Sequence, residues 1–424
     1  MKISVAELME RSGVAFGTSG ARGLVEAMSD EICYLYVRAF LQYLEHSRVV
    51  APSSRVAVAG DLRPSTPAII KACLKAVKDA GFQGVFCGFI PSPAAALYGI
   101  EQQIPAIMVT GSHIPDDRNG IKFNKPQGEI LKADEEAIRD QLLAVPEALF
   151  DGNGKFLDPE NLPAEDPSAR ELYIRRFRDF FDSDSLQGMR IGLYQHSSVS
   201  RDILFEILQS LDAEVVALGR SDAFVPVDTE AIRREDVELA AAWSQQYRLD
   251  SIVSTDGDGD RPLISDENGE WLRGDIAGIL CAYFLQAAAV VTPVSSNSAV
   301  ELSGLFQKVL RTRIGSPYVI SAMEEAMRAG CQRVIGYEAN GGLLQQDSIS
   351  VDGRSLAALP TRDAVIVIVA ILVMSRKRDR PISALVASLP QRYTFSDRLK
   401  QFPTEVSRSR LARITEADAK AAQE

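Results

Sequence analysis

A serine loop and a ladder of carboxylates, far apart in the sequence, carry the residue types needed for phosphoryl transfer. Residues 110–115 read Thr-Gly-Ser-His-Ile-Pro, and residues 256–261 read Asp-Gly-Asp-Gly-Asp-Arg. The first segment offers a hydroxyl in a tight turn, and the second offers three hard oxygen ligands to a divalent cation. Together the two segments predict a metal-assisted phosphoryl-transfer site.

The carboxylate ladder itself predicts a metal ion. Asp256, Asp258 and Asp260 alternate with glycines, so a tight loop can turn all three side chains toward one point. Clustered anions repel each other unless a cation lies between them, and oxygen-only ligands favour Mg²⁺ over zinc. An oxygen of the Ser112 segment would complete the metal ligands, and Arg261, fixed beside the metal, would pair with a phosphate.

A calcium-binding EF-hand is the main alternative for this ladder. The three aspartates fall at loop positions 1, 3 and 5, and Glu267 falls at position 12. Position 6 requires glycine but holds Arg261, and the flanking residues 251–254 and 262–264 read as strands rather than helices. The sequence therefore favours a loop between strands.

Four motifs in a fixed order connect these segments to a known family. Residues 16–23, 110–122, 256–261 and 336–341 stand in the order seen in α-D-phosphohexomutases, and the resemblance covers about residues 14 to 375. The chain thus resembles the phosphomannomutase and phosphoglucomutase family. The resemblance implies α/β domains around a central cleft, a Mg²⁺-dependent isomerase, and exchange of phosphate between positions 1 and 6 of a hexose through a hexose 1,6-bisphosphate.

The resemblance also implies roles for individual residues. Ser112 would carry the phosphoryl group, and His113 would orient its loop. Any such mutase must take a proton from the attacking sugar hydroxyl, and Arg22 and Lys122 are the candidates for proton handling and charge control. Ile114 stands where the family usually has asparagine.

The loop at residues 336–342 is the expected sugar-binding segment. Glu338 and Asn340 offer a carboxylate and an amide, which suit vicinal hydroxyls. The family loop usually reads Gly-Glu-x-Ser-Gly-His, so Asn340 replaces serine and Gly342 replaces histidine. Because the asparagine version resembles the acetylglucosamine-phosphate mutases, the sequence leaves mannose, glucose and amino-sugar phosphates open as substrates.

Apolar runs alternate with helical stretches in three blocks, which is typical of sheets covered by helices. Each polar motif follows an apolar strand, where open α/β sheets bind ligands. Residues 61–65 are expected to form a turn and helix cap, and residues 364–374 a buried helix. The expected strands are 55–59, 84–89, 105–109, 190–194, 213–218, 251–254, 289–294 and 333–337, and the expected helices are 67–80, 201–211 and 318–329.

The expected domains are residues 1–150 with the serine loop, 151–265 with the metal loop, 266–378 with the sugar loop, and a partial domain at 379–424. The family's last domain carries an Arg-x-Ser-Gly-Thr-Glu-Pro segment that grips the second phosphate, and residues 377–424 contain no such segment. We therefore expect a truncated or weakened fourth domain. Loss of that grip should reduce turnover as well as affinity.

Composition narrows the possible partners. The 46 basic and 57 acidic residues give a formal charge of −11, which argues against nucleic-acid binding. Five scattered cysteines and the lack of an apolar N-terminal run favour a cytoplasmic protein. The apolar run at residues 364–374 is too short to cross a bilayer, so no membrane partner is expected. The expected state is a monomer or homodimer. A sugar-phosphate-binding protein without catalysis, and a metal phosphatase, remain alternatives to the mutase.

Overall fold

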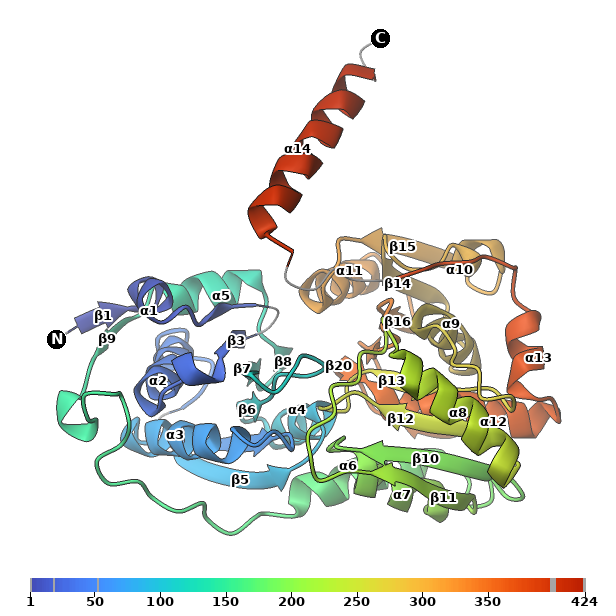
Figure 1. Cartoon of the computed structure of the whole chain (residues 1–424), viewed down its shortest axis with the longest axis horizontal. Coiled ribbons are helices and arrows are strands. Elements are labelled where there is room, and N and C mark those ends of the chain that lie inside the picture. The colour runs from blue at the N-terminus through green and yellow to red at the C-terminus, as the bar shows by residue number, and fades with distance from the viewer. Residues whose placement is uncertain (1, 18–19, 52, 397–401, 422–424) are drawn as a thin grey trace. The chain divides into compact units, whose positions relative to one another are not determined.

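The structure, a computed structural model, describes residues 2–17, 20–51, 53–396 and 402–421. These residues form two compact units, Met1–Arg392 and Tyr393–Glu424. Thr18 and Ser19 of the predicted opening motif lie outside the described residues. The larger unit contains three mixed sheets with helices packed on them (Figure 1).

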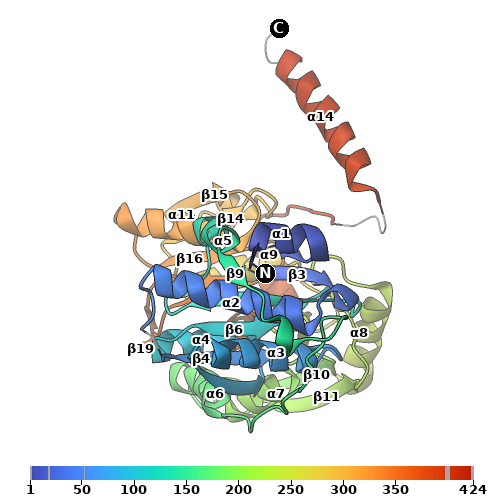
Figure 2. The ribbon, with the colours of Figure 1, turned by 90° about the vertical axis from the view of Figure 1, so that its left-hand side faces the viewer.

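The first sheet has the strand order β2-β3-β7-β6-β4-β5, with β8 beside β7. β4 is parallel to β5 and β6, whereas β7 is antiparallel to β6, β3 and β8. Alternate residues of β4 face opposite sides of the sheet. Val56 and Val58 pack in the core that also contains residues of α2 and α3. These two helices lie side by side (Figure 2). Ala57 and Ala59 join the core that contains α4. The elements are β1 (Lys2–Ser4), α1 (Val5–Ser12), β2 (Ala15–Phe16), β3 (Gly20–Leu24), α2 (Asp30–His46), β4 (Arg55–Gly60), α3 (Thr66–Asp79), β5 (Gln83–Phe89), α4 (Ser92–Gln102), β6 (Ala106–Val109), β7 (Arg118–Lys125), β8 (Gly128–Glu129), α5 (Lys132–Arg139) and β9 (Leu142–Ala144).

The second sheet has the order β11-β10-β12-β13. β10 is parallel to β11 and β12, and β13 returns antiparallel to β12, so the 256–261 loop is a connection between two adjacent strands. The elements are α6 (Ser168–Phe180), β10 (Arg190–His196), α7 (Arg201–Ser210), β11 (Glu214–Arg220), α8 (Arg234–Tyr247), β12 (Ser251–Thr255) and β13 (Pro262–Ile264).

The third sheet has the order β15-β14-β16-β17-β20. β14 is parallel to β15 and β16, and β17 is antiparallel to β16 and β20. The elements are α9 (Gly274–Phe284), β14 (Ala289–Pro293), α10 (Ala299–Leu302), β15 (Lys308–Thr312), α11 (Ser316–Arg328), β16 (Val334–Tyr337), β17 (Leu343–Gln345), β18 (Ile349–Val351), β19 (Arg354–Leu356), β20 (Leu359–Asp363), α12 (Ala364–Arg378) and α13 (Ile382–Ala387).

Helix α12 is the buried helix that the sequence predicted. All its residues from Ala364 to Ser375 are buried, and they share one core with α4, α6 and α9. Asp363 caps its first turn by accepting hydrogen bonds from the amides of Val365 and Ile366, at 2.9 and 3.4 Å. Among the residues that the structure describes, no helix is long and apolar enough to cross a membrane.

Residues 393–424 contribute one described helix, α14 (Thr404–Ala421). Side chains described in this unit are largely exposed, including Tyr393, Leu411 and Ile414. The five cysteines are free thiols, and only Cys331 is partly exposed.

Candidate active site

The serine loop begins directly after β6. Ser112 has a φ of 56°, in the left-handed region that non-glycine residues rarely adopt, and is 1% exposed. Its amide donates to the Thr110 hydroxyl over 2.7 Å, and its hydroxyl donates to Asp256 Oδ2 over 2.7 Å. The sequence therefore predicted correctly that the two segments meet.

The carboxylate loop connects β12 to β13, so its flanks are strands and the EF-hand alternative is wrong. Its glycines permit close packing: a Cβ at Gly257 would lie 2.7 Å from the Ser112 carbonyl oxygen, and one at Gly259 would lie 2.1 Å from Ser200 Oγ. Asp256, Asp258 and Asp260 are 0%, 0% and 2% exposed. Their ligand oxygens lie within 4.8 Å of one another.

Two neighbouring groups hold part of this negative charge. Lys122 on β7 places Nζ 2.6 Å from Asp258 Oδ2 and 2.9 Å from Asp260 Oδ2. Burial alone would lower the pKa of Lys122, but the charges of Asp258 and Asp260 outweigh it and raise the pKa above its ordinary value. Ser92, the first residue of α4, donates to Asp258 over 2.6 Å.

The remaining carboxylate oxygens fit a hard cation. Within the described residues, Asp258 Oδ1 and Asp260 Oδ1 are buried without a hydrogen-bond partner. Burial and the charges of Asp258 and Asp260 raise the pKa of Asp256 well above its ordinary value. Buried, repelling and unpartnered oxygens are the donor set that Mg²⁺ neutralises, so the residues present fit the predicted metal.

Arg362, at the end of β20, links the carboxylate loop to the sugar loop. Its Nη2 donates to Asp260 Oδ2 over 2.7 Å, and its Nη1 donates to Glu338 Oε2 over 2.8 Å. Glu338 is 4% exposed and directly follows β16. The expected sugar-binding carboxylate therefore lies in the same charged cluster as the expected metal ligands.

Asn340 is placed differently from Glu338. Its side-chain oxygen accepts the Gly342 amide over 2.9 Å, and its carbonyl accepts the Thr229 hydroxyl over 3.1 Å. The asparagine thus shapes the 338–342 turn and ties it to the 221–233 loop. A serine at position 340 would accept the Gly342 amide only with a different geometry, because its side-chain oxygen is one bond closer to the backbone than that of asparagine.

Three further predicted residues surround the serine and the carboxylates. Arg261 Nε lies 3.7 Å from Asp260 Oδ1 and 4.0 Å from Asp256 Oδ2. Burial lowers the pKa of Arg22 on β3, and the Asp258 charge partly offsets this. Burial and the Arg261 charge lower the pKa of His113 to about 3, so its imidazole is neutral near pH 7. His113 Nδ1 lies 3.3 Å from Ser112 Oγ.

Sequence reasoning missed Arg63 and Ser92 and assigned no role to Arg362. Residues 61–65 do form a turn, but Ser65 makes no side-chain cap to α3, so the expected helix cap is wrong. Asp61 Oδ1 instead accepts the Arg63 amide and the Thr66 hydroxyl, at 3.1 and 2.7 Å. The available signal in the sequence was an Asp-x-Arg segment directly after an apolar strand.

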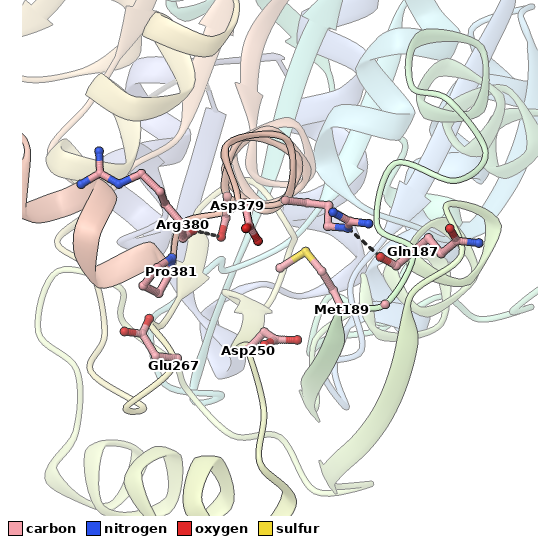
Figure 3. A pocket seen from close by; sticks show the side chains of 10 residues that line it. Gln187, Met189, Asp250, Glu267, Asp379, Arg380 and Pro381 are labelled. Atoms are coloured by element: carbon pink, nitrogen blue, oxygen red, sulfur yellow. Dashed lines mark hydrogen bonds between the residues drawn. The ribbon is translucent and has the colours of Figure 1, made fainter.

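A cavity of about 440 Å³ lies apart from these residues. Figure 3 shows Glu267 beneath Arg380 and Pro381. Arg376 also lines this cavity, and its Nε donates to the Gln187 carbonyl over 2.7 Å. Glu267, position 12 of the rejected EF-hand, accepts hydrogen bonds from Ser383 rather than facing the carboxylate loop. Most of the cavity's charged side chains are exposed, and none is among the predicted site residues.

Comparison with known proteins identifies the family of the chain. Residues 13–148, 171–269 and 273–393 match the alpha/beta/alpha domains I, II and III of phosphoglucomutase/phosphomannomutase. A phosphomannomutase of Salmonella muenchen is 45% identical over 405 residues, which cover 95% of this chain and 81% of the relative. A phosphomannomutase of Sinorhizobium fredii is 46% identical over 399 residues, or 93% and 82% of the two chains.

A solved structure shows the same fold. The putative phosphomannomutase from Thermus thermophilus superposes with a TM-score of 0.71 at 20% identity, covering 88% of this chain and 82% of that one. The predicted fold of successive α/β domains is confirmed, and the relatives support the predicted phosphohexomutase function. The chain belongs to the phosphoglucomutase/phosphomannomutase family.

Proposed function

We propose that the chain is a Mg²⁺-dependent phosphomannomutase, which interconverts mannose 1-phosphate and mannose 6-phosphate through phosphorylated Ser112 and a hexose 1,6-bisphosphate. The observation that carries the proposal is the hydrogen bond from Ser112 Oγ to Asp256 Oδ2 inside a buried carboxylate cluster. Mannose is favoured because the two relatives at 45% and 46% identity are both phosphomannomutases.

Asp256, Asp258, Asp260 and the oxygen of Ser112 would hold the magnesium ion, which when bound supplies positive charge that withdraws electrons from the phosphoryl group. Arg261 lies beside two of these carboxylates and is positioned to pair with phosphate oxygens. Neutral His113 contacts the serine hydroxyl without adding charge to it.

Lys122 and Glu338 complete the proposed roles. With its raised pKa, Lys122 keeps its proton and acts by balancing the charge of Asp258 and Asp260. Glu338 accepts hydrogen bonds from sugar hydroxyls while Arg362 holds its other oxygen, and Asn340 shapes the loop that presents it. Arg22 on β3 remains the proposed group for handling the proton of the attacking hydroxyl.

The test is a coupled mutase assay with Mg²⁺ and catalytic hexose 1,6-bisphosphate. Mannose, glucose, glucosamine and acetylglucosamine 1-phosphates are compared as substrates, and turnover is expected to be fastest with mannose 1-phosphate. Ser112→Ala is expected to abolish turnover, because the phosphoryl acceptor is lost. Ser53→Ala is the matched control, since Ser53 is also a serine with left-handed φ, 64°, but is exposed.

Each outcome decides between the alternatives. A fully active Ser112→Ala enzyme would refute the phosphoserine mechanism. Steady release of inorganic phosphate without isomerisation would indicate a phosphatase. Tight sugar-phosphate binding without turnover of any of the four substrates would indicate a non-catalytic binding protein. Fastest turnover of another hexose phosphate would keep the mutase and overturn mannose as its substrate.

We also propose a cytoplasmic location. All five cysteines are free thiols, four of them buried, and thiols of this kind persist in reducing compartments. Fractionation of cells that produce the protein, followed by the mutase assay, tests this location.

A further inference from the structure

The guanidinium of Arg63 uses all its donors around the serine loop. Nη2 donates to the carbonyls of Ser112 and Ile114 over 2.8 and 2.6 Å. Nη1 donates to the carbonyls of Pro115 and Arg118 over 2.7 and 3.1 Å. The remaining donor, Nε, reaches Asp61 Oδ2 over 3.1 Å. Because an arginine has five N–H donors, none is left over for substrate or solvent.

A second path also leads from Arg63 to the serine. Asp61 Oδ2, which accepts Arg63 Nε, also accepts the Thr110 hydroxyl over 2.7 Å. The Thr110 hydroxyl oxygen in turn accepts the Ser112 amide over 2.7 Å. Arg63 therefore fixes both backbone polar groups of Ser112, its carbonyl directly and its amide through Asp61 and Thr110.

Packing fixes the guanidinium itself. The Arg63 side chain is fully buried, and a Cβ at Gly111 would lie 2.6 Å from its Cζ. Cζ of Arg63 also lies over the ring of Phe224, in the loop between β11 and α8, 4.1 Å from the ring centroid. The same ring lies 3.4 Å from the position of a Cβ at Gly257 in the carboxylate loop. One aromatic ring thus contacts both the arginine and the expected metal loop.

We propose that Arg63 is a positioning residue for phosphoryl transfer, which holds the strained Ser112 backbone so that its hydroxyl faces Asp256, and that Phe224 seals the guanidinium in place. This inference rests on the proposed role of Ser112 as phosphoryl carrier. Arg63 contacts no group that reacts, and its effect passes through the loop carbonyls.

Only a planar, five-donor group can satisfy this arrangement. A lysine ammonium has three donors at one point and cannot reach four carbonyls and a carboxylate from one position. In Arg63→Lys at least two of these five acceptors would lose their hydrogen bond. A displaced nucleophile slows the chemical step more than it weakens substrate binding.

The experiment measures kcat, KM and the single-turnover phosphorylation of Ser112 by hexose 1,6-bisphosphate, the last by intact mass. All measurements are made well below the Tm on the full chain, with folding checked by circular dichroism. Arg63→Lys is expected to lower kcat and the phosphorylation rate by about 100-fold, with KM unchanged. Arg55→Lys is the matched control, because Arg55 is exposed at the start of β4 and is expected to leave both rates unchanged.

Folded Arg63→Lys protein with wild-type kcat and phosphorylation rate would overturn the inference, even if its Tm were lower. If Arg63→Lys does not fold, Phe224→Ala is the second variant that tests the proposal. This variant is expected to fold, because Phe224 is half-buried and lies on a loop. A lowered kcat at unchanged KM in Phe224→Ala supports the proposal, and an unchanged kcat overturns it. Ser112→Ala, measured in parallel, separates the two claims: activity in that variant refutes the proposed function, whereas its inactivity beside a wild-type-like Arg63→Lys refutes only the positioning role.

Discussion

At the scale of single residues, the site is a group of buried charges that are only partly matched. Lys122 and Arg362 each hold Asp260 Oδ2, yet Asp256 receives hydrogen bonds only from the Ser112 hydroxyl and two backbone amides, among the residues described. The side chain of Arg261 is farther away, with its Nε 4.0 Å from Asp256 Oδ2. Asp256 is therefore the carboxylate whose ionisation the surrounding protein opposes most, which makes it the most informative position for a metal test.

Asp256→Asn should stabilise the protein without metal. Burial and the neighbouring aspartates raise the pKa of Asp256, so the folded state binds its proton more tightly than the unfolded state. This contribution to stability is fully present below the unfolded pKa of about 4 and is lost as the pH rises through the folded value. In EDTA, the free energy of unfolding of the Asn variant minus that of the wild type should grow as the pH rises above about 4, and the variant should be the more stable protein at pH 7.

Thermal unfolding across this pH range measures the effect. Mg²⁺ should reverse the order at pH 7, adding about 2.7 kcal/mol to the wild type at 100 times its Kd and little to the variant. Asp184→Asn, on the exposed loop before β10, should leave both curves unchanged. A variant that is less stable than wild type in EDTA at pH 7 would contradict the argument.

Residue types and spacing predicted the candidate catalytic and metal-binding residues. They did not predict the arginines that position these residues. Ser112 and the three aspartates stand out because hydroxyl and carboxylates alternate with glycine. Arg63 and Arg362 do not, since their partners are distant in sequence: the nearest loop carbonyl is 49 positions from Arg63, and Asp260 is 102 positions from Arg362. Such pairs become visible only once the chain is folded.

At the scale of elements, the serine, metal and sugar loops all follow strands of their sheets. The predicted strands before these loops correspond to β6, β12 and β16, each a short, fully buried run. The antiparallel return strand β7, which carries Lys122, was not predicted as a strand. Its sequence is polar and contains glycine, and its pairing with β3 and β6 overrides that weak local preference.

Helix α12 depends on its buried cap. Asp363 accepts two amides of the first turn and the Tyr173 hydroxyl of α6, the latter over 2.6 Å. Asp363→Ala removes the cap and leaves a buried hydroxyl unpaired, so we expect the free energy of unfolding to fall by about 3 kcal/mol. Asp363→Asn keeps an accepting oxygen and should cost less.

Urea unfolding of the three proteins measures these differences. Asp184→Ala, on the exposed loop before β10, is the control and should change the free energy of unfolding by less than about 0.5 kcal/mol. Equal destabilisation by the alanine and asparagine variants at position 363 would show that the carboxylate charge, rather than the cap, carries the effect.

At the scale of the whole molecule, residues 393–424 form a unit with no core of their own among the residues described. An isolated helix of this length is only marginally stable in water. Removal of residues 393–424 should therefore leave the Tm of the remaining chain unchanged, since the contact from Asn297 Nδ2 to the Arg392 carbonyl, 2.9 Å long, is retained. Calorimetry of the shortened chain checks this, and a Tm lower by several degrees would show that the segment stabilises the larger unit.

The near-complete burial of the carboxylate loop has a kinetic consequence. A hydrated ion cannot reach carboxylates that are 0–2% exposed while Lys122 and Arg362 hold the Oδ2 atoms of Asp258 and Asp260. Entry and escape of the ion must wait for a fluctuation that separates β7 and β20 from the loop, and such collective motions take microseconds or longer. If Mg²⁺ binds here as proposed, its release is limited by this opening, so chelator should inactivate the enzyme at a rate that does not depend on chelator concentration.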